Sequence, residues 1–150
     1  MRRMRTGVAG VVVALAVAAT LGGCATDGGI TRGRLQAAVG PTFQRMYLLQ
    51  QSIEGHQDPY TRPDTSVASC TRGGPSTPDD GPGADWICVV HWPSPSGITE
   101  PVAYDVSVQP GGCYTAEGPA TTVGQQTIPD GGGKSVPNPL LAFDGCLRIG

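Results

Sequence analysis

The chain begins with an uninterrupted apolar stretch that is typical of an export signal. Three arginines and no acidic residue lie within the first five positions, and residues 8–21 are mostly Val, Ala and Leu. A helix of 14 residues would span roughly 21 Å, which is short of the ~30 Å hydrocarbon core of a bilayer. The pattern therefore favours a signal peptide over a permanent transmembrane span.

A cysteine follows this stretch in a context that indicates lipidation. Leu21-Gly22-Gly23-Cys24 resembles the lipobox of bacterial lipoproteins, in which the cysteine thiol receives a diacylglyceryl group and becomes the N-terminus after cleavage. The resemblance implies a signal peptide at 1–23, a linker at 24–30 and one extracytoplasmic domain at 31–150, anchored in the membrane through lipid on Cys24. Two acyl chains suffice for stable anchoring. The alternative is an ordinary signal peptide that is cut nearby.

The next periodic segment predicts an amphipathic helix over residues 31–53. Apolar residues recur there at intervals of three and four, which places them on one side of a helix: Leu35, Val39, Phe43, Met46, Leu49 and Ile53. Thr31 is a suitable N-cap and Gly55 a suitable stop. Pro41 lacks an amide hydrogen, so we expect a kink or two helical pieces. Packing on a sheet is favoured over a helix that lies on the membrane.

Most later apolar residues alternate with polar ones, which predicts strands. The clearest strands cover 85–92 and 101–109, with a short one at 66–71, a last one at 140–149 and a further candidate at 121–128. In 85–92 one face carries Trp86, Cys88, Val90 and Trp92, and the other carries Ile87, Val89 and His91. Turns rich in Gly and Pro separate these segments. We therefore expect an α+β fold, with one N-terminal helix packed on a four- or five-stranded antiparallel sheet.

Four cysteines besides Cys24 indicate two disulfides. Their separations of 18, 25 and 33 residues contain no Cys-x-x-Cys pair, which disfavours zinc. Four cysteines in an exported chain allow three pairings. In the expected meander, Cys70 and Cys88 fall on the two arms of one hairpin, and Cys113 and Cys146 fall at a strand end and within a later neighbouring strand. We therefore predict the disulfides Cys70–Cys88 and Cys113–Cys146.

Composition and charge narrow the class of protein. The 23 Gly and 14 Pro among 150 residues exclude a long-helix bundle or a coiled coil. Removal of residues 1–23 leaves seven basic and twelve acidic residues, a formal charge of −5. The basic residues are scattered without aromatic neighbours, so no nucleic-acid partner is expected. Anionic headgroups should repel such a chain, which leaves the lipid as its membrane attachment.

Candidate catalytic and metal-binding groups are few. His56 follows the predicted helix and His91 lies in a predicted central strand, but no Gly-x-Ser-x-Gly elbow accompanies them. Asp79, Asp80 and Asp85 could suit Ca²⁺, although their pattern departs from an EF-hand loop and a solvated turn is the favoured interpretation. We expect no catalytic residue, no metal and no cofactor.

Three features of the chain together suggest a group of proteins. The composition, the lipobox and the segment Gly-Pro-Gly-Ala-Asp-Trp-Ile-Cys at 81–88 are similar to small lipoproteins of high-GC Gram-positive bacteria (actinobacteria). The resemblance implies export and lipidation and brings no catalytic residues with it.

The favoured hypothesis is a membrane-anchored binding or accessory module at the cell envelope, with an envelope protein as its partner. Its contact surface would be the sheet face that the helix leaves free, at Ile87, Val89 and His91, unless residues 114–139 fold over it. The main alternative is a small enzyme that uses His91 or His56. A solute-binding component of a transporter and a hydrolase inhibitor with a protruding loop at 72–84 are further alternatives.

Overall fold

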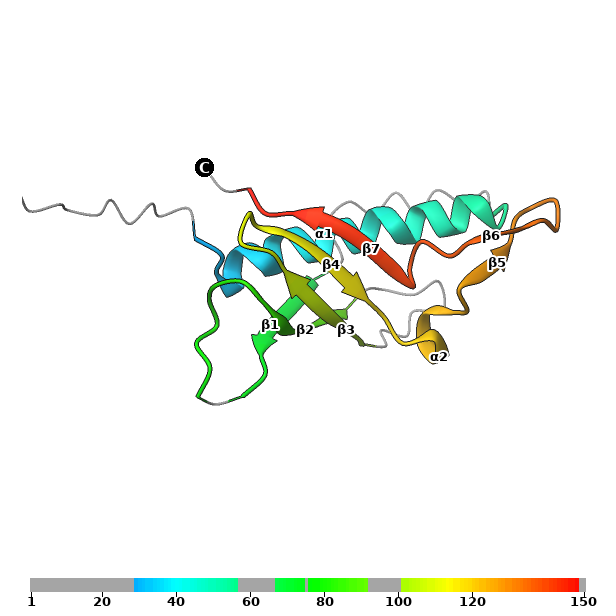
Figure 1. Cartoon of the computed structure of the whole chain (residues 1–150). Coiled ribbons are helices and arrows are strands. Elements are labelled where there is room, and N and C mark those ends of the chain that lie inside the picture. The colour runs from blue at the N-terminus through cyan, green and yellow to red at the C-terminus, as the bar shows by residue number, and fades with distance from the viewer. Residues whose placement is uncertain (1–28, 57–66, 75, 92–100, 149–150) are drawn as a thin grey trace, which may run out of the picture.

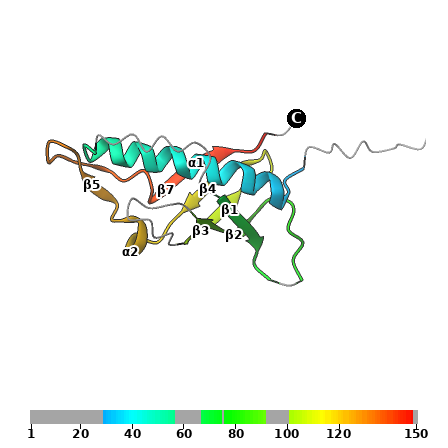
Figure 2. The same cartoon turned by 180° about the vertical axis from the view of Figure 1, so that it is seen from behind.

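One long helix lies against one face of a five-stranded antiparallel sheet (Figures 1 and 2). The computed structural model describes residues 29–56, 67–74, 76–91 and 101–148. The sheet order is β1-β2-β3-β4-β7, and its elements are α1 (Arg32–Ile53), β1 (Val67–Arg72), β2 (Gly83–His91), β3 (Val102–Val108), β4 (Cys113–Glu117) and β7 (Ala142–Cys146). Between β4 and β7 lie α2 (Ala120–Val123) and a hairpin of β5 (Thr127–Pro129) and β6 (Ser135–Pro137). The predicted α+β fold is confirmed.

Helix α1 has the boundaries that its capping residues predict. The Thr31 side chain accepts a hydrogen bond from the Arg34 amide at 3.4 Å, which satisfies one of the free donors of the first turn. The helix ends before Gly55, whose φ of 78° is a conformation that suits glycine. Pro41 lies inside one continuous helix of 22 residues, so the predicted division into two pieces does not occur.

In the second half of α1, the buried residues differ from those that the apolar periodicity predicts. Leu35, Val39 and Phe43 are buried as expected, but the next buried residues are Tyr47 and Gln50. Leu49 is 46% exposed, so its predicted place in the core is wrong. The polar Gln50 is buried because its side-chain amide donates to Asn138 Oδ1 at 3.0 Å, a partner 88 residues away.

The segment at 121–128 does not form the single strand that its Thr and Val residues suggest. Residues 120–123 make one turn of helix, in which the amides of Thr122 and Val123 donate to the Pro119 carbonyl. Gly124, at φ 97°, ends this turn and leads the chain into β5. Cys113 likewise begins β4 rather than ending the preceding strand. These local turns depend on Pro and Gly, which outweigh strand propensity here.

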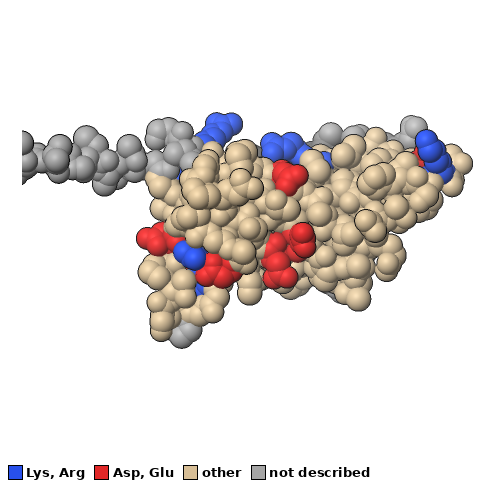
Figure 3. Space-filling model, in the orientation of Figure 1, with Lys and Arg blue, Asp and Glu red and all other residues tan. Residues whose placement is uncertain are grey.

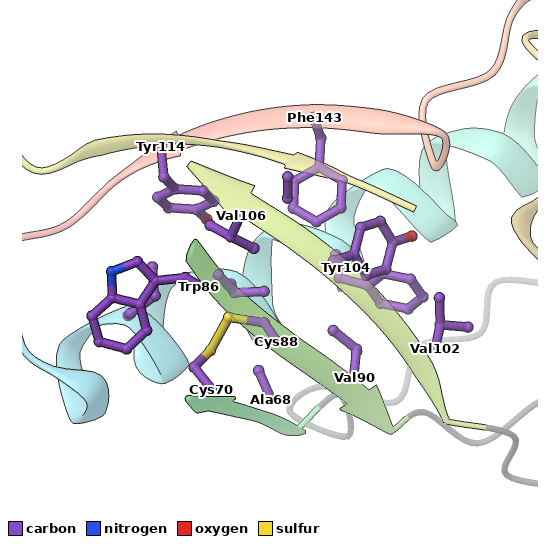
Figure 4. Close-up of a cluster of buried hydrophobic side chains, with 14 of the residues drawn as sticks. Ala68, Cys70, Trp86, Cys88, Val90, Val102, Tyr104, Val106, Tyr114 and Phe143 are labelled. Carbon is purple, nitrogen blue, oxygen red and sulfur yellow. A yellow bond between two sulfur atoms is a disulfide. The ribbon is translucent and has the colours of Figure 1, made fainter. Parts of the chain in front are cut away.

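The core lies between α1 and the inner face of the sheet (Figure 4). Strands β2 and β3 bury alternate residues toward the helix, as predicted. Tyr104 occupies the centre, with edge contacts to Phe43 at 5.9 Å and to Phe143 at 5.1 Å between ring centroids. Its hydroxyl donates to the Leu140 carbonyl at 2.9 Å. The central tyrosine therefore joins the helix, the sheet and the segment that enters β7.

Both predicted disulfides are present, and each one fastens an edge strand. Cys70 lies directly opposite Cys88 on β1 and β2, and Cys113 lies directly opposite Cys146 on β4 and β7. Loops of 18 and 33 residues correspond to roughly 3 and 4 kcal/mol in the chain-entropy account of disulfide stabilisation. Two structural disulfides in so small a domain indicate an oxidising, extracytoplasmic environment.

The predicted signal peptide and Cys24 lie outside the described residues, as do Trp92 and Ile149. Within the described ranges, neither helix is long and apolar enough to cross a membrane. Ile30, the residue before the N-cap, is buried in the core, and its carbonyl accepts a hydrogen bond from the Gly81 amide at 2.9 Å.

We expect the two disulfides to be reduced in order, because reduction requires access of a thiolate to sulfur. Cys146 is exposed, whereas Cys70 and Cys88 are at most 1% exposed. Increasing dithiothreitol under native conditions should therefore free Cys113 and Cys146 first, and Cys70 and Cys88 only on unfolding. Thiol alkylation followed by peptide mass spectrometry measures this order. Simultaneous release of all four thiols would contradict it.

Burial of Tyr104 should make the fold sensitive to alkali. Desolvation raises the pKa of this phenol well above its ordinary value, so its stabilising effect is complete below about pH 10 and declines as the unfolded chain ionises above that pH. Tyr104→Phe should lower the free energy of unfolding by about 1–2 kcal/mol at neutral pH, because the Leu140 carbonyl loses its donor. Above about pH 10 the free energy of unfolding should fall less steeply with pH in the variant than in the wild-type chain. The difference between the two slopes should approach about 1.4 kcal/mol per pH unit. Urea unfolding between pH 7 and about pH 11.5 gives both values, and parallel curves would contradict the assignment.

Candidate functional site

The sheet face opposite α1 carries a small exposed apolar surface. We define the outer patch as the five residues Val67, Ile87, Val89, His91 and Ala103. Their strand register makes them neighbours: His91 lies opposite Val67, and Val89 lies opposite Ala103. Val67 is 61% exposed and Ile87 is 42% exposed. The predicted contact residues Ile87, Val89 and His91 therefore do lie together on the face that the helix leaves free.

Residues 118–139 do not fold over this face. The Gly131 amide donates to the Ile53 carbonyl at 2.8 Å, and the Asn138 side chain bonds Gln50 and the carbonyl of Val123. These contacts hold the segment against the C-terminal half of α1, beyond the end of the sheet (Figure 1). The alternative in which this loop covers the patch is therefore wrong, and none of the described segments lies on it.

Acidic side chains lie on the same face, beside the outer patch (Figure 3). Asp105 on β3 stands directly opposite Glu117 on β4, and Asp144 on β7 lies opposite Thr115. Asp105 and Glu117 border a shallow depression of about 200 Å³. Neither carboxylate forms an ion pair with a basic residue in the described part of the chain. Like charges in directly opposed positions destabilise a sheet, so this pair imposes a cost on the fold.

The acidic loop between β1 and β2 forms ion pairs rather than a solvated turn or a calcium site. Asp79 binds Arg32 of α1 at 2.8 Å and accepts the Arg72 amide at 2.8 Å, while Asp85 binds the Arg72 guanidinium at 2.8 Å. The hydrogen bonds from Arg72 hold the pKa of Asp85 below its ordinary value. Asp79 thus fixes the loop to the start of α1, and Asp85, which lies within β2, binds the last residue of β1. No group of three metal-ligating side chains occurs among the described residues.

The two histidines lie in separate parts of the fold. His56 follows α1, with its Nε2 3.5 Å from Glu54 Oε2, and His91 is exposed at the end of β2. Within the described ranges, neither imidazole hydrogen-bonds a hydroxyl, and the four cysteines are oxidised in pairs. The arrangement that nucleophilic catalysis requires is therefore not assembled around either histidine in these ranges.

The structure also brings together basic residues that are scattered along the chain. Arg34 and Arg45 of α1 and Arg148 after β7 line a pocket of about 310 Å³ between the helix and the last strand. Arg148 is more than 100 residues from the other two, so only the pairing of β7 with the sheet edge reveals this cluster. Sequence reasoning missed it because no local motif connects the three arginines.

These observations define a small, disulfide-bonded α+β domain with an exposed sheet face. No family model matches the chain, and neither a curated protein nor a solved structure matches it. The inference of function therefore begins from the outer patch and its charged surroundings.

Proposed function

We propose that the protein is a lipid-anchored binding module on the outer side of the cell membrane, and that it engages an envelope protein through the outer patch. The observation that carries this proposal is the apolar surface on the sheet face opposite α1, where Val67 and Ile87 are exposed and Val89 is half-buried. A surface with an apolar centre and a polar rim is typical of protein contacts. The lipobox supports the anchoring, and the disulfides support the compartment.

The charges around the patch suggest the chemistry of the partner. Asp105 and Glu117 repel each other across β3 and β4, and a basic partner would relieve that repulsion. Complementary charge speeds association and selects among partners more than it adds affinity. The proposed partner therefore presents an apolar contact flanked by lysine or arginine side chains.

A binding role accounts for the exposed groups better than catalysis does. His91 belongs to the outer patch, but its neighbours Val67 and Val89 are apolar and cannot serve as a nucleophile or as an orienting base. His56 lies beside Glu54 at the end of the helix, on a different element. An exposed histidine beside apolar residues fits a contact surface. The alternative of a histidine-dependent enzyme predicts that His91→Ala or His56→Ala abolishes the cellular phenotype.

Lipidation is tested on the full chain expressed in a bacterium that processes lipoproteins. The wild-type protein should incorporate a clickable palmitate analogue and partition with membranes, whereas Cys24→Ser should lose both properties. The Cys113→Ala/Cys146→Ala double variant is the matched control, because it removes two cysteines, which form one disulfide, from the domain and leaves the lipobox intact. Mass spectrometry that finds Met1 retained and no acyl group on the wild-type chain would contradict the anchoring.

Binding through the patch is tested with a photo-crosslinking amino acid at Thr71, which is exposed and lies opposite Ile87. Irradiation of intact cells should yield one crosslinked partner, and Ile87→Ser should reduce the yield about tenfold or more, as expected for a central contact. Leu49→Ser is the matched control, since Leu49 is exposed to a similar degree, 46% against 42%, but lies on α1. Equal yields from the two variants would contradict the proposal.

Asp105→Asn separates binding from folding within the same experiment. The substitution removes a like-charge contact, so it should raise the free energy of unfolding by about 0.2–1 kcal/mol. It should nevertheless slow association with a basic partner and make the association rate less dependent on salt concentration. A variant that is more stable and yet crosslinks less cannot have lost binding through misfolding. Unchanged crosslinking at low and high salt would contradict the proposed charge of the partner.

A further inference from the structure

The pocket between α1 and β7 has a distinctive combination of charge and shape. Guanidinium groups of Arg34, Arg45 and Arg148 surround it, and none of its lining residues is acidic. Its apolar lining includes Ala37 and Ala38 of the helix. A volume of about 310 Å³ is at the lower end of the range for small-ligand sites. The pocket therefore offers concentrated positive charge next to a small apolar surface.

Two of these arginines carry charges that the described fold does not neutralise. Arg45 donates from Nη2 to the Thr42 hydroxyl at 2.9 Å, and neither Arg45 nor Arg148 forms an ion pair with a described residue. Arg32 and Arg72 differ, because each binds an aspartate at 2.8 Å. The charges of Arg45 and Arg148 thus lie together beside the pocket, and Figure 3 shows basic side chains along the edge above the acidic sheet face.

A buried hydroxyl, that of Tyr114, lies behind Gly145, one of the residues that line the pocket. Tyr114 is 2% exposed, and its hydroxyl has no hydrogen-bond partner of good geometry in the described structure. A Cβ at Gly145, which lines the pocket, would clash with this oxygen, so the hydroxyl occupies the space that a side chain would otherwise fill. Burial raises the pKa of Tyr114, and Thr42 and the charge of Arg45, both of which line the pocket, act in the opposite direction.

We propose that the pocket between α1 and β7 binds a phosphate group through Arg34, Arg45 and Arg148. Guanidinium groups match the geometry of phosphate oxygens and bind them with paired hydrogen bonds. The surface at Ala37 and Ala38 accommodates the organic part that carries the phosphate. The site does not depend on the function of the outer patch, which is on a different face.

The phosphate could come from a soluble ester or from a lipid headgroup, and the position of the pocket bears on that source. Arg34 lies in the first turn of α1, next to the point where the chain enters the fold at Ile30. The six residues from Ala25 to Ile30 could extend over about 20 Å, so the proposed lipid on Cys24 would keep this edge near the membrane surface. The chain without residues 1–23 has a formal charge of −5, but physiological salt screens charges over about 8 Å. The arginines therefore determine the electrostatic potential at the pocket.

The first test uses the mature lipidated protein in neutral detergent micelles. Inorganic phosphate and glycerol 3-phosphate should raise the melting temperature and protect Arg45 and Arg148 from phenylglyoxal, whereas chloride at equal ionic strength should not. Arg45→Gln and Arg148→Gln should each weaken phosphate affinity about tenfold or more.

Two control variants distinguish a built site from general attraction of anions. Lys134→Gln removes one positive charge from the distant β5–β6 hairpin and should leave phosphate affinity unchanged. Ala37→Phe keeps every charge but fills the pocket from an exposed helix position, so it should weaken binding as the arginine variants do. Equal losses in Lys134→Gln and Arg45→Gln, or unchanged affinity in Ala37→Phe, would overturn the proposal.

The second test identifies the source of the phosphate. The lipidated protein is reconstituted in phosphatidylcholine vesicles with and without phosphatidylglycerol, and the modification of Arg45 and Arg148 is measured. Protection that requires phosphatidylglycerol assigns the site to a headgroup, and protection by glycerol 3-phosphate alone assigns it to a soluble ester. Both results support the site. Absence of protection by vesicles, inorganic phosphate and glycerol 3-phosphate alike would overturn it.

Discussion

The packing of a single helix on a five-stranded sheet governs the rest of this structure. Helix α1 contacts both edge strands, β1 and β7, and it meets the centre of the sheet where Phe43 touches Tyr104. A helix is about 10 Å wide, so it covers one face of the sheet only in part. The segment from α2 to β7 closes the remaining inner side with Val123 and Leu140. None of the described segments is left for the other face, and both the outer patch and the edge pocket follow from this arrangement.

The periodic segments of the chain were predictable because their buried residues recur at every second position in strands and at every third or fourth position in the helix. Strands β2 and β3 and the first half of α1 match the expected elements and faces. The disulfide Cys70–Cys88 follows from hairpin geometry, and Cys113–Cys146 from the pairing of neighbouring strands. The second half of α1 does not match, because a hydrogen bond between Gln50 and Asn138 decides which side is buried. Local pattern carries no information on a partner 88 residues away. Strand β4 buries only Tyr114 and Ala116, which is too short an alternation to stand out.

The candidate sites also differ in whether local sequence pattern or tertiary contacts determine them. Ile87, Val89 and His91 could be placed on the free face because they alternate with core residues of one strand. The arginine pocket could not be predicted, since it requires Arg148 to meet the N-terminal helix. The ion pairs of Arg72 with Asp85 and of Arg32 with Asp79 also depend on tertiary contacts. Three nearby carboxylates suggested a cation site or a solvated turn, whereas in the fold two of them bind guanidinium groups.

The beginning of α1 and the end of β7 lie at the same end of the molecule, and the β5–β6 hairpin lies at the other (Figure 1). Helix α1, with 22 residues, measures about 33 Å along its axis, so the hairpin turn is well separated from the point where the chain enters the fold. An affinity tag or fluorophore appended after Arg148 would sit beside that entry point and crowd the arginines. The turn at 130–133 is the better place for such a label, because it reports on the far end without obstructing either surface.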